Sequence, residues 1–456
     1  MDLQITSLFL LAYFLTSSEA LFKALKTQDV EYDRDDVGEP LILTPLLEQE
    51  QIREARRAAI VNLTGDAKDV RSYAGYFTVN KRYNSNQFFW FFPSKSNPAK
   101  DPVLVWLQGG PGVSSMYGVL VETGPFFINK KQELELRKYS WVNNHSVIYI
   151  DNPVGTGFSF TKNEDGYARN ETQIGNELYE ALRQFFKLFS EHRKNEFYIH
   201  GESYAAKYAL ALAHTIHTNN PHAQEKINLK GVAIGDGYID PEHQTGYAEY
   251  LYQLGLVDEK HAEEIKRYEN AAVEAIRKGN YILSSDLKVK ALVVIEQQAN
   301  VSFYNYLKEG GVPGEDQMNN FLNQSEVRRS LHVGETTFGS EKVEAFLADD
   351  LQRSVAPWLV EVANNYRLLL YSGQLDIIVA YPLTLNMLKN LEFKDAKEYR
   401  KAKRKIWYIG NQPAGYSKSA GNFTEVLVRD AGHIVPYDQP KWAEDLISRF
   451  TRNKSF

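Results

Sequence analysis

The chain alternates short apolar runs, rich in β-branched and aromatic residues, with longer segments that carry apolar residues at helical spacing. The runs predict strands at residues 88–92, 103–107, 147–150, 197–199, 229–234, 367–371, 406–409 and 424–428. A helix is predicted at 174–189, where Leu178, Leu182, Phe185 and Phe189 recur at three- and four-residue spacing. Strands that alternate with helices favour a mostly parallel sheet covered by helices. The predicted fold class is therefore α/β.

The remaining segments divide the chain around this sheet. Residues 21–70 are dense in charge, carry a helical pattern at 46–60, and predict a pro-segment or a loosely docked N-terminal arm. Between residues 238 and 355 the strand pattern gives way to helical stretches such as 258–278, which indicates an inserted, mostly helical cap. The sheet core is then expected to consist of residues 71–237 and 356–456.

The N-terminus has the features of a secretory signal peptide. An apolar run at residues 5–15 is too short to span a bilayer, and it precedes Ser18-Glu19-Ala20, a small-x-small pattern typical of signal-peptide cleavage. Residues 1–20 are therefore predicted to be a signal peptide, and the protein is expected to be secreted or lysosomal without a membrane anchor. Asn-x-Ser/Thr sequons agree with this route and predict glycosylation at Asn62, Asn144, Asn170, Asn300, Asn323, Asn422 and Asn453.

The composition excludes several kinds of chemistry. The 456 residues include no cysteine, so thiol catalysis, thiolate metal sites and disulfides are ruled out. A net charge of −6 provides no basic field for nucleic acid. The glycine-rich turns at 108–112 and 155–157 complete no nucleotide-binding motif, and no spacing of histidines suggests zinc. We therefore expect neither a cofactor nor a metal, while oligomerisation stays open.

One predicted strand runs directly into a turn that suits a nucleophilic serine. Residues 197–199 lead through His200 into GESYA at 201–205, where Gly201 and Ala205 stand two positions before and after Ser203. Small residues at these positions let the following helix pack close to the strand, and the sharp turn exposes the hydroxyl. The pattern predicts a nucleophile elbow. Without its context, a serine in an ordinary turn is the alternative.

A nucleophilic serine needs a base and an orienting carboxylate, and both follow later in the chain. Asp376 comes after the predicted strand 367–371, and His433 follows the predicted strand 424–428. In α/β-hydrolases these groups follow in the order nucleophile, acid, histidine, at the carboxyl ends of strands. Taken singly, Asp376 could be a turn former and His433 a structural histidine. Their order and position together predict a catalytic triad with Ser203.

The backbone after the predicted strand 103–107 offers the donors that such a reaction also needs. The run Gln108-Gly109-Gly110-Pro111-Gly112 provides N–H groups outside a regular ladder, as an oxyanion hole requires. A turn that only reverses the chain is the alternative.

Four motifs in fixed order resemble those of the serine carboxypeptidases. They are WLQGGPG at 106–112, DNPVGTGFS at 151–159, GESYA at 201–205 and AGHIVPYDQP at 431–440. Within that family the vitellogenic-like branch is most similar, on the strength of Gln108, SYAGY at 72–76, FFWFFP at 88–93 and IGDGY at 234–238. The resemblance runs from about Ser72 to the end of the chain, and it implies an α/β-hydrolase fold with a helical insertion.

The resemblance also implies an activity and the residues that perform it. A protein of this kind removes residues one at a time from peptides with a free C-terminus, at acidic pH. Ser203 is then the nucleophile, His433 the general base and acid, and Asp376 its orienting partner. The resemblance places the oxyanion hole at the N–H groups of Gly110 and Tyr204, and the substrate carboxylate at Gln108, the N–H of Gly109, Glu122 and Glu202.

The residues implied to bind the substrate carboxylate explain a preference for acidic pH. An anion beside Glu122 and Glu202 is repelled unless the two carboxyls share a proton. Two other functions stay open at this point. One is an acyltransferase that uses the same triad, and the other is a non-catalytic secreted binding protein on the hydrolase scaffold. The second gains weight from Val113 and Ala206, which replace a family cysteine and a family glycine.

Overall fold

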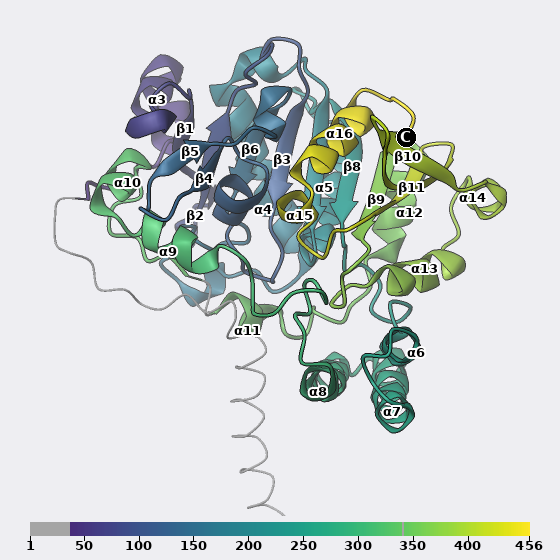
Figure 1. Cartoon of the computed structure of the whole chain (residues 1–456). Coiled ribbons are helices and arrows are strands. Elements are labelled where there is room, and N and C mark those ends of the chain that lie inside the picture. Colours follow the sequence, from purple (N-terminus) through teal and green to yellow (C-terminus); the bar gives the residue numbers. More distant parts are fainter. Residues whose placement is uncertain (1–36, 340–341) are drawn as a thin grey trace, which may run out of the picture.

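The computed structural model describes residues 37–339 and 342–456, which form a ten-stranded sheet with helices on both faces (Figure 1). The predicted signal peptide lies outside these residues. The strands are β1 (Tyr73–Asn80), β2 (Ser85–Phe92), β3 (Val103–Leu107), β4 (Phe126–Ile128), β5 (Leu134–Leu136), β6 (Ser146–Ile150), β7 (Phe197–Glu202), β8 (Leu229–Gly235), β9 (Arg367–Gly373), β10 (Lys405–Ile409), β11 (Gln412–Ala420) and β12 (Phe423–Val428). Strands β4 and β5 form a separate small sheet.

The large sheet is parallel in its centre and antiparallel at its edges. Its order is β1-β2-β6-β3-β7-β8-β9-β12-β11-β10, and neighbours from β6 to β12 are parallel. The carboxyl ends of these central strands therefore meet at one edge of the sheet, where open α/β sheets place their functional loops. The predicted α/β class with a mostly parallel sheet is confirmed.

Helices follow most of the central strands. They are α2 (Thr44–Glu48), α3 (Ile52–Ala58), α4 (Glu171–Leu188), α5 (Ala205–Asn219), α6 (Tyr247–Gln253), α7 (Glu259–Arg277), α8 (Tyr281–Ala299), α9 (Glu315–Leu322), α10 (Ser325–Ser330), α11 (Val343–Leu347), α12 (Ala356–Asn365), α13 (Tyr381–Asn390), α14 (Ala396–Lys401), α15 (Val435–Asp438) and α16 (Pro440–Thr451). Of these, α4 and α5 cross between β6, β7 and β8 and pack against each other.

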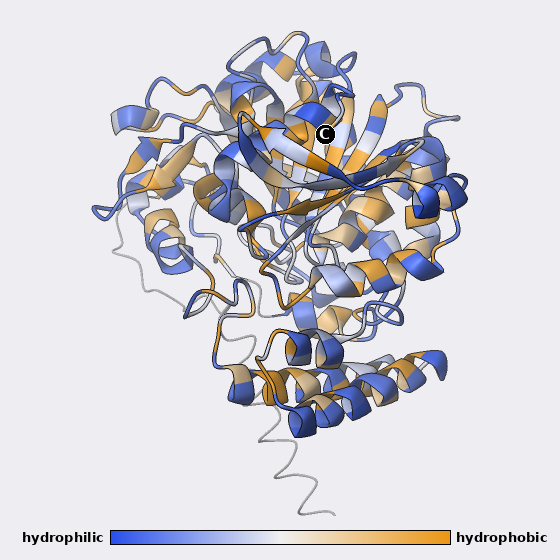
Figure 2. Cartoon of the chain, turned by 45° about the vertical axis from the view of Figure 1, so that its right-hand side comes forward, coloured by the Kyte–Doolittle hydropathy of each residue, from blue (hydrophilic) through white to orange (hydrophobic). Residues whose placement is uncertain are grey.

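The core lies on both faces of the sheet. Along β3, Val103 and Val105 pack into the cluster that contains α4 and α5, while Leu104 and Trp106 pack into the cluster that contains α16. Because successive side chains of a strand point to opposite faces, a strand covered on both sides must be apolar throughout. Figure 2 shows these apolar strands enclosed by helices of mixed hydropathy. This explains why the strands could be predicted from continuous apolar runs in the sequence.

The segment before β1 packs firmly against the sheet. The N–H of Leu43 donates to the carbonyl of Tyr76, and the N–H of Tyr76 donates to the carbonyl of Leu41, both at 2.9 Å. Leu43 and Leu47 are buried in the core. The described part of the arm, residues 37–70, is therefore not loosely docked as expected. Its removal as a pro-segment stays a prediction.

Some elements differ from their predicted form. The single helix expected at 46–60 is interrupted at Glu50, whose φ is 57°, and becomes α2 and α3. Strands β1 and β11 were not predicted, because glycine and polar residues interrupt their apolar pattern.

The insertion between β8 and β9 divides into two parts. Helices α6 to α8 form a bundle beyond the carboxyl ends of the strands, below the sheet in Figure 1, around a small cluster of their own that includes Leu251 and Ile265. Helices α9 and α10 instead run back along the sheet, where Met318 and Phe321 of α9 join the main core. The bounds of the predicted cap, 238–355, stay a prediction.

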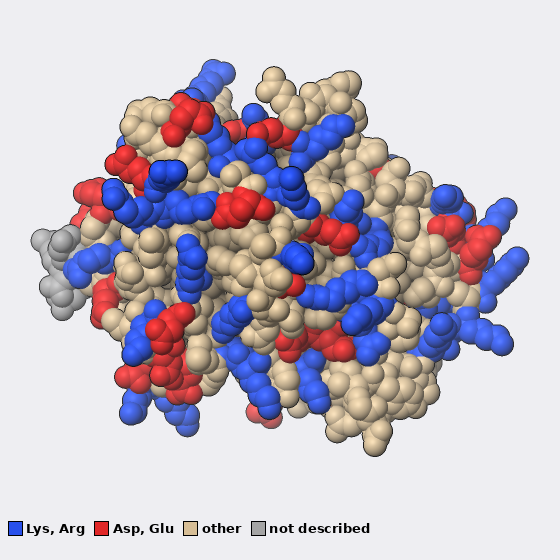
Figure 3. Space-filling view, turned by 90° about the horizontal axis from the view of Figure 1, so that it is seen from above, with Lys and Arg blue, Asp and Glu red and all other residues tan. Residues whose placement is uncertain are grey.

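The face away from α6 to α8 carries charges of both signs. In Figure 3, Lys and Arg side chains are interspersed with Asp and Glu side chains over that face. Such a mixture gives no long-range field of one sign. Within the described ranges, no helix is long and apolar enough to cross a membrane.

Candidate active site

Ser203 occupies the sharp turn between β7 and α5. Its φ of 60° lies in the left-handed region, which is strained for a residue with a Cβ and characterises a nucleophile elbow. The N–H of Ser203 donates to the carbonyl of Gly235 at 2.9 Å, and its own carbonyl accepts from the N–H of Tyr238 at 3.0 Å. A Cβ on Gly201 would lie 2.2 Å from the carbonyl oxygen of Ala205. The turn is therefore held on both sides and needs glycine at position 201.

Asp376 and His433 lie on neighbouring loops after β9 and β12. The Nδ1 atom of His433 is 2.8 Å from Oδ2 of Asp376, and both side chains are buried. The N–H of Val379 lies 3.3 Å from each carboxylate oxygen of Asp376, which helps to fix its orientation. The structure thus brings the predicted acid and base together.

The serine stands apart from this pair in hydrogen bonding. Among residues 37–339 and 342–456, no hydrogen bond joins the Ser203 hydroxyl to His433 or to any other group, and Ser203 is half-buried. Catalytic hydrogen bonds of this kind are often long without substrate and tighten when it binds. The geometry therefore leaves the hydroxyl free to approach a substrate carbonyl.

A segment of the insertion braces both loops. The N–H of His433 donates to the carbonyl of Tyr304 at 2.6 Å, and the Tyr304 ring meets the imidazole edge to face, with centroids 5.3 Å apart. The carbonyl of Phe303 accepts from the N–H of Ile377 at 2.9 Å. Sequence reasoning missed this segment, because backbone acceptors leave no mark on residue type.

The glycine-rich turn after β3 lies directly against the elbow. A Cβ on Gly109 would lie 2.9 Å from the Cβ of Ser203 and 2.8 Å from the backbone nitrogen of Tyr204, so only glycine fits. The N–H groups of Gly110 and Tyr204 have no acceptor within the described part of the chain. Unpaired backbone donors beside a nucleophile are what an oxyanion hole requires.

Gln108, Glu122 and Glu202 form a buried polar cluster beside the same turn. The Nε2 of Gln108 donates to Oε1 of Glu202, and its Oε1 accepts from the indole N–H of Trp106, each at 2.8 Å. The contact with Trp106 settles which way the amide points. Neither oxygen of Glu122 has a donor among the described residues, and nor does Oε2 of Glu202.

Burial raises the pKa of both Glu122 and Glu202, and the charge of Glu202 raises that of Glu122 further. A proton shared between the two carboxyls satisfies the oxygens that otherwise have no donor. The pair therefore carries at most one negative charge in the range where these raised pKa values lie.

A cavity of about 290 Å³ opens beside Ser203, Gly110 and Tyr204. Its walls are mostly apolar, and they include Ile282, Val289, Leu292, Ile378 and Val379. The site therefore has an apolar recess next to the nucleophile, on the side of α8.

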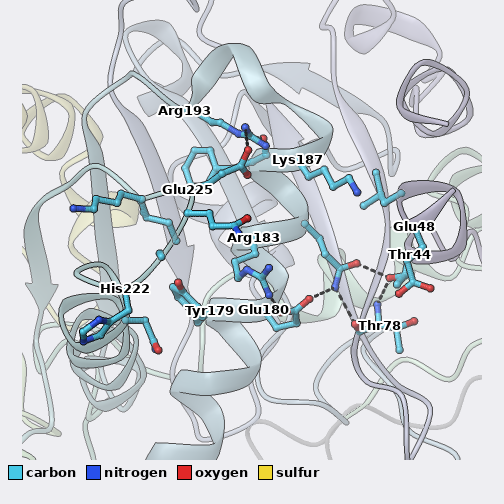
Figure 4. Close-up of a pocket in the computed structure, with 18 of the residues that line it drawn as sticks. Thr44, Glu48, Thr78, Tyr179, Glu180, Arg183, Lys187, Arg193, His222 and Glu225 are labelled. Carbon is cyan, nitrogen blue, oxygen red and sulfur yellow. Dashed lines mark hydrogen bonds and ion pairs between the residues drawn. The ribbon is translucent and has the colours of Figure 1, made fainter. Parts of the chain in front are cut away.

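A different hollow, drawn in Figure 4, lies against α4 and the loop after α5. Its charged side chains pair with one another, since Arg183 lies 2.9 Å from Glu180 and Arg193 contacts Glu225. Although its volume is about 520 Å³, none of the predicted site residues lines it. Size alone therefore does not mark the place of the chemistry.

Asp236 is a buried acid to which the sequence analysis gave no role. It follows β8, and one oxygen each of Asp236 and Asp376 and a ring nitrogen of His433 lie within 4.8 Å of one another. Burial and the charge of Asp376 raise the pKa of Asp236 well above its ordinary value. Asp236 lies at the end of a core strand, between the strands that precede Ser203 and Asp376. This position is the signal by which the sequence could have identified it.

The fold defines the chain as an α/β-hydrolase, and Ser203, Asp376 and His433 follow β7, β9 and β12 in the order that such folds use for nucleophile, acid and histidine. The sequence profile of the serine carboxypeptidase family, peptidase S10, matches residues 63–453. The chain therefore belongs to the serine carboxypeptidase family.

Similar proteins agree with this membership. The venom serine carboxypeptidase of Apis mellifera is 48% identical over 434 residues, which cover 92% of this chain and 93% of that protein. The probable serine carboxypeptidase CPVL of Homo sapiens is 45% identical and covers 96% and 95%. The vitellogenic carboxypeptidase of Aedes aegypti is 45% identical and covers 91% and 90%. The predicted family resemblance is confirmed.

Among solved structures, the prohormone-processing carboxypeptidase KEX1(DELTA)P of Saccharomyces cerevisiae superimposes with a TM-score of 0.77. The two chains are 22% identical, and the match covers 87% of this chain and 96% of that one. At this identity the likeness concerns the fold, and it confirms the α/β-hydrolase architecture.

Proposed function

We propose that this serine carboxypeptidase releases C-terminal residues from peptides through an acyl-enzyme on Ser203. Family membership makes the chain a serine-type peptidase. The observation that carries the mechanism is that one sheet edge holds the Ser203 turn, the Asp376–His433 pair and the cluster around Glu202. This combination joins a nucleophile to a site that recognises a carboxylate.

In the proposed reaction, the Ser203 oxygen attacks the carbonyl carbon of the last peptide bond while His433 takes the hydroxyl proton. Asp376 holds the imidazole by its Nδ1–H and stabilises its positive charge. The negative oxygen of the tetrahedral intermediate accepts hydrogen bonds from the N–H groups of Gly110 and Tyr204. His433 then protonates the leaving amine, and a water molecule repeats the sequence to free Ser203.

The substrate carboxylate would bind at the polar cluster beside the elbow. Only one of the two N–H groups on Nε2 of Gln108 goes to Glu202, so the other can donate to the substrate, as can the N–H of Gly109. Glu122 and Glu202 tolerate an anion only while they keep a proton between them. The side chain that precedes the cleaved bond would enter the apolar recess next to Ser203.

Secretion or lysosomal delivery forms part of the same proposal. The Apis mellifera relative is named a venom serine carboxypeptidase, which supports export, as do the apolar residues 5–15. Glycosylation at the sequons also remains a proposal, for which the exposure of Asn62, Asn170 and Asn300 is favourable.

Family membership disfavours the non-catalytic alternative. Ala206 is buried beside Gly237, where a Cβ added at 237 would lie 2.9 Å from the Ala206 methyl, yet Ser203 keeps its left-handed turn.

The acyltransferase alternative differs from hydrolysis in the acceptor of the acyl group. Supplying an acyl donor with and without a nucleophilic amine or alcohol distinguishes the two reactions.

Blocking the substrate's C-terminus tests the proposal. We expect amidation of a peptide to lower kcat/KM at pH 5 at least about tenfold, because lost charge-assisted contacts to the carboxylate are worth roughly 1–3 kcal/mol each. Mass spectrometry of paired acid and amide peptides measures the ratio. Equal cleavage of the two forms would overturn the carboxypeptidase assignment and leave the hydrolase fold untouched.

A substitution at Gln108 refines this test. Gln108→Ala should slow cleavage of the free acid more than that of the amide, because only the acid uses the second N–H of Nε2. Gln184→Ala is the matched control, since Gln184 is a buried glutamine that bonds Thr44 away from the site. The idea fails if both variants leave the acid-to-amide ratio unchanged.

The pH dependence should differ between substrates. Peptide cleavage needs neutral His433 and also the shared proton on Glu122 and Glu202, which is lost as pH rises through their raised pKa values. A neutral ester needs only the imidazole. We therefore expect peptide hydrolysis to be fastest below neutrality and ester hydrolysis to continue to higher pH. Identical kcat/KM profiles from pH 4 to 9 would contradict the shared-proton explanation.

A further inference from the structure

Two buried carboxyls meet behind the histidine. Asp236 and Asp376 are both 0% exposed, and they follow the adjacent strands β8 and β9. Their oxygens, together with a ring nitrogen of His433, lie within 4.8 Å of one another. Two ionised carboxylates that are this close and buried away from bulk solvent repel each other strongly. One proton must therefore be held between them.

The hydrogen bonds decide which acid holds that proton. Asp376 faces Nδ1 of His433 at 2.8 Å and the N–H of Val379 at 3.3 Å from both oxygens, so its two oxygens serve as hydrogen-bond acceptors. Asp236 accepts one hydrogen bond, from the N–H of Gly373 at 2.8 Å to Oδ1. Its Oδ2 has no donor among the described residues although it is fully buried. A protonated Oδ2 removes this deficit.

We propose that Asp236 is a positioning residue that stays protonated and donates a hydrogen bond from Oδ2 to the carboxylate of Asp376. That bond holds Asp376 towards His433 and so fixes the imidazole. The inference rests on the proposed triad and adds a member behind it. Asp236 touches neither substrate nor reacting atoms, and it acts only through Asp376.

The other groups near Asp236 agree with this protonation state. Glu202 and Asp376 are the acids whose charges act on it, and both raise its pKa beyond the effect of burial. Burial and the charge of Glu202 raise the pKa of the Tyr371 hydroxyl, on the adjacent strand β9, so that this group stays neutral. His433 faces the cluster across Asp376.

Asparagine is the substitution that separates the proposal from a simple packing role. In Asp236→Asn, the amide N–H₂ can donate to Asp376 while the amide oxygen accepts from Gly373, which reproduces both bonds. Asparagine also tolerates the φ of 44° found at this position. Asp236→Gly tolerates the same φ but removes the side chain and its donor.

The experiment measures kcat/KM for a neutral ester from pH 5 to 10 in the full chain. At pH 5 to 6 we expect Asp236→Asn to keep at least about a third of the wild-type value and Asp236→Gly to lose about a hundredfold, the cost of a misplaced catalytic group. At high pH the wild type should decline when Asp236 ionises, because a donor becomes a second negative charge beside Asp376. The asparagine variant cannot ionise, so its alkaline limb should extend to higher pH.

Three results would overturn the proposal. They are a loss in Asp236→Asn as large as in Asp236→Gly, an alkaline limb that the asparagine does not move, and a glycine variant with wild-type rate. Thermal unfolding shows whether the glycine variant is folded; where it is not, the alkaline limb of Asp236→Asn decides. Because the probe is an ester, failure of C-terminal peptide cleavage would refute the proposed function without touching this inference.

Discussion

Replacing Ser203 with alanine is expected to abolish turnover of peptides and esters, with a loss in kcat on the order of 10⁶. The hydroxyl oxygen forms the covalent bond in the proposed mechanism, and no neighbouring group can supply it. The fold should survive, because the hydroxyl makes no hydrogen bond with a described residue and the turn is held by backbone contacts to Gly235 and Tyr238. Steady-state kinetics and thermal unfolding of the same preparation measure both effects.

A covalent probe sharpens this test. A fluorophosphonate should add its mass once to the wild type, on the peptide that contains Ser203, and not at all to Ser203→Ala. Ser190→Ala is the control, since Ser190 is an exposed serine after α4. Full activity in Ser203→Ala would remove Ser203 from the mechanism. An unfolded variant would instead mean that the residue supports the structure.

The central sheet was predictable because its strands are buried on both faces. Such strands contain little besides apolar residues, and every one of the runs at 103–107, 147–150, 197–199 and 229–234 lies within a strand of the structure. Strand β11, which lies between β12 and the edge strand β10, was missed, since one of its faces is exposed to solvent and Lys418 and Ser419 interrupt the apolar pattern. The division of the insertion into α6 to α8 and α9 to α10 could not be predicted either, because the position of α9 is set by tertiary contacts of Met318 and Phe321.

The site was predictable where it depends on local chain geometry. The Ser203 turn needs small neighbours, and the turn at Gly109 needs glycine, so both leave a mark on the sequence. Groups that contact the site from a distant part of the chain leave no such pattern in the sequence. Tyr304 supports His433 with a backbone carbonyl, which any residue possesses. The partnership of Asp236 with Asp376 became visible only when β8 and β9 were seen side by side.

For Asp376→Asn we expect a loss in kcat on the order of 10⁴. In the wild type, the carboxylate oxygen 2.8 Å from Nδ1 of His433 requires the ring proton on that nitrogen, which leaves Nε2 free to accept from Ser203. An asparagine whose N–H₂ group faces Nδ1 favours the opposite tautomer, which cannot act as a base. Neutral-ester hydrolysis at pH 7 measures the effect, and Asp349→Asn, at an exposed acid, is the control.

The size of the loss in Asp376→Asn also tests whether Asp236 can orient His433 in place of Asp376. Burial is the main reason why the pKa of Asp236 is raised, and the charge of Asp376 raises it further. Once position 376 is neutral, this second contribution disappears, so the Asp236 carboxyl ionises more readily within reach of the imidazole. A loss smaller than tenfold would show that another carboxylate orients His433, and Asp236 is the acid placed to do so. The double variant Asp236→Asn with Asp376→Asn then decides between the two acids. If Asp236 substitutes for Asp376, the double variant falls well below Asp376→Asn alone. If Asp376 is the sole orienting acid, the two variants have the same rate, because Asp376→Asn has already lost the only carboxylate that orients His433.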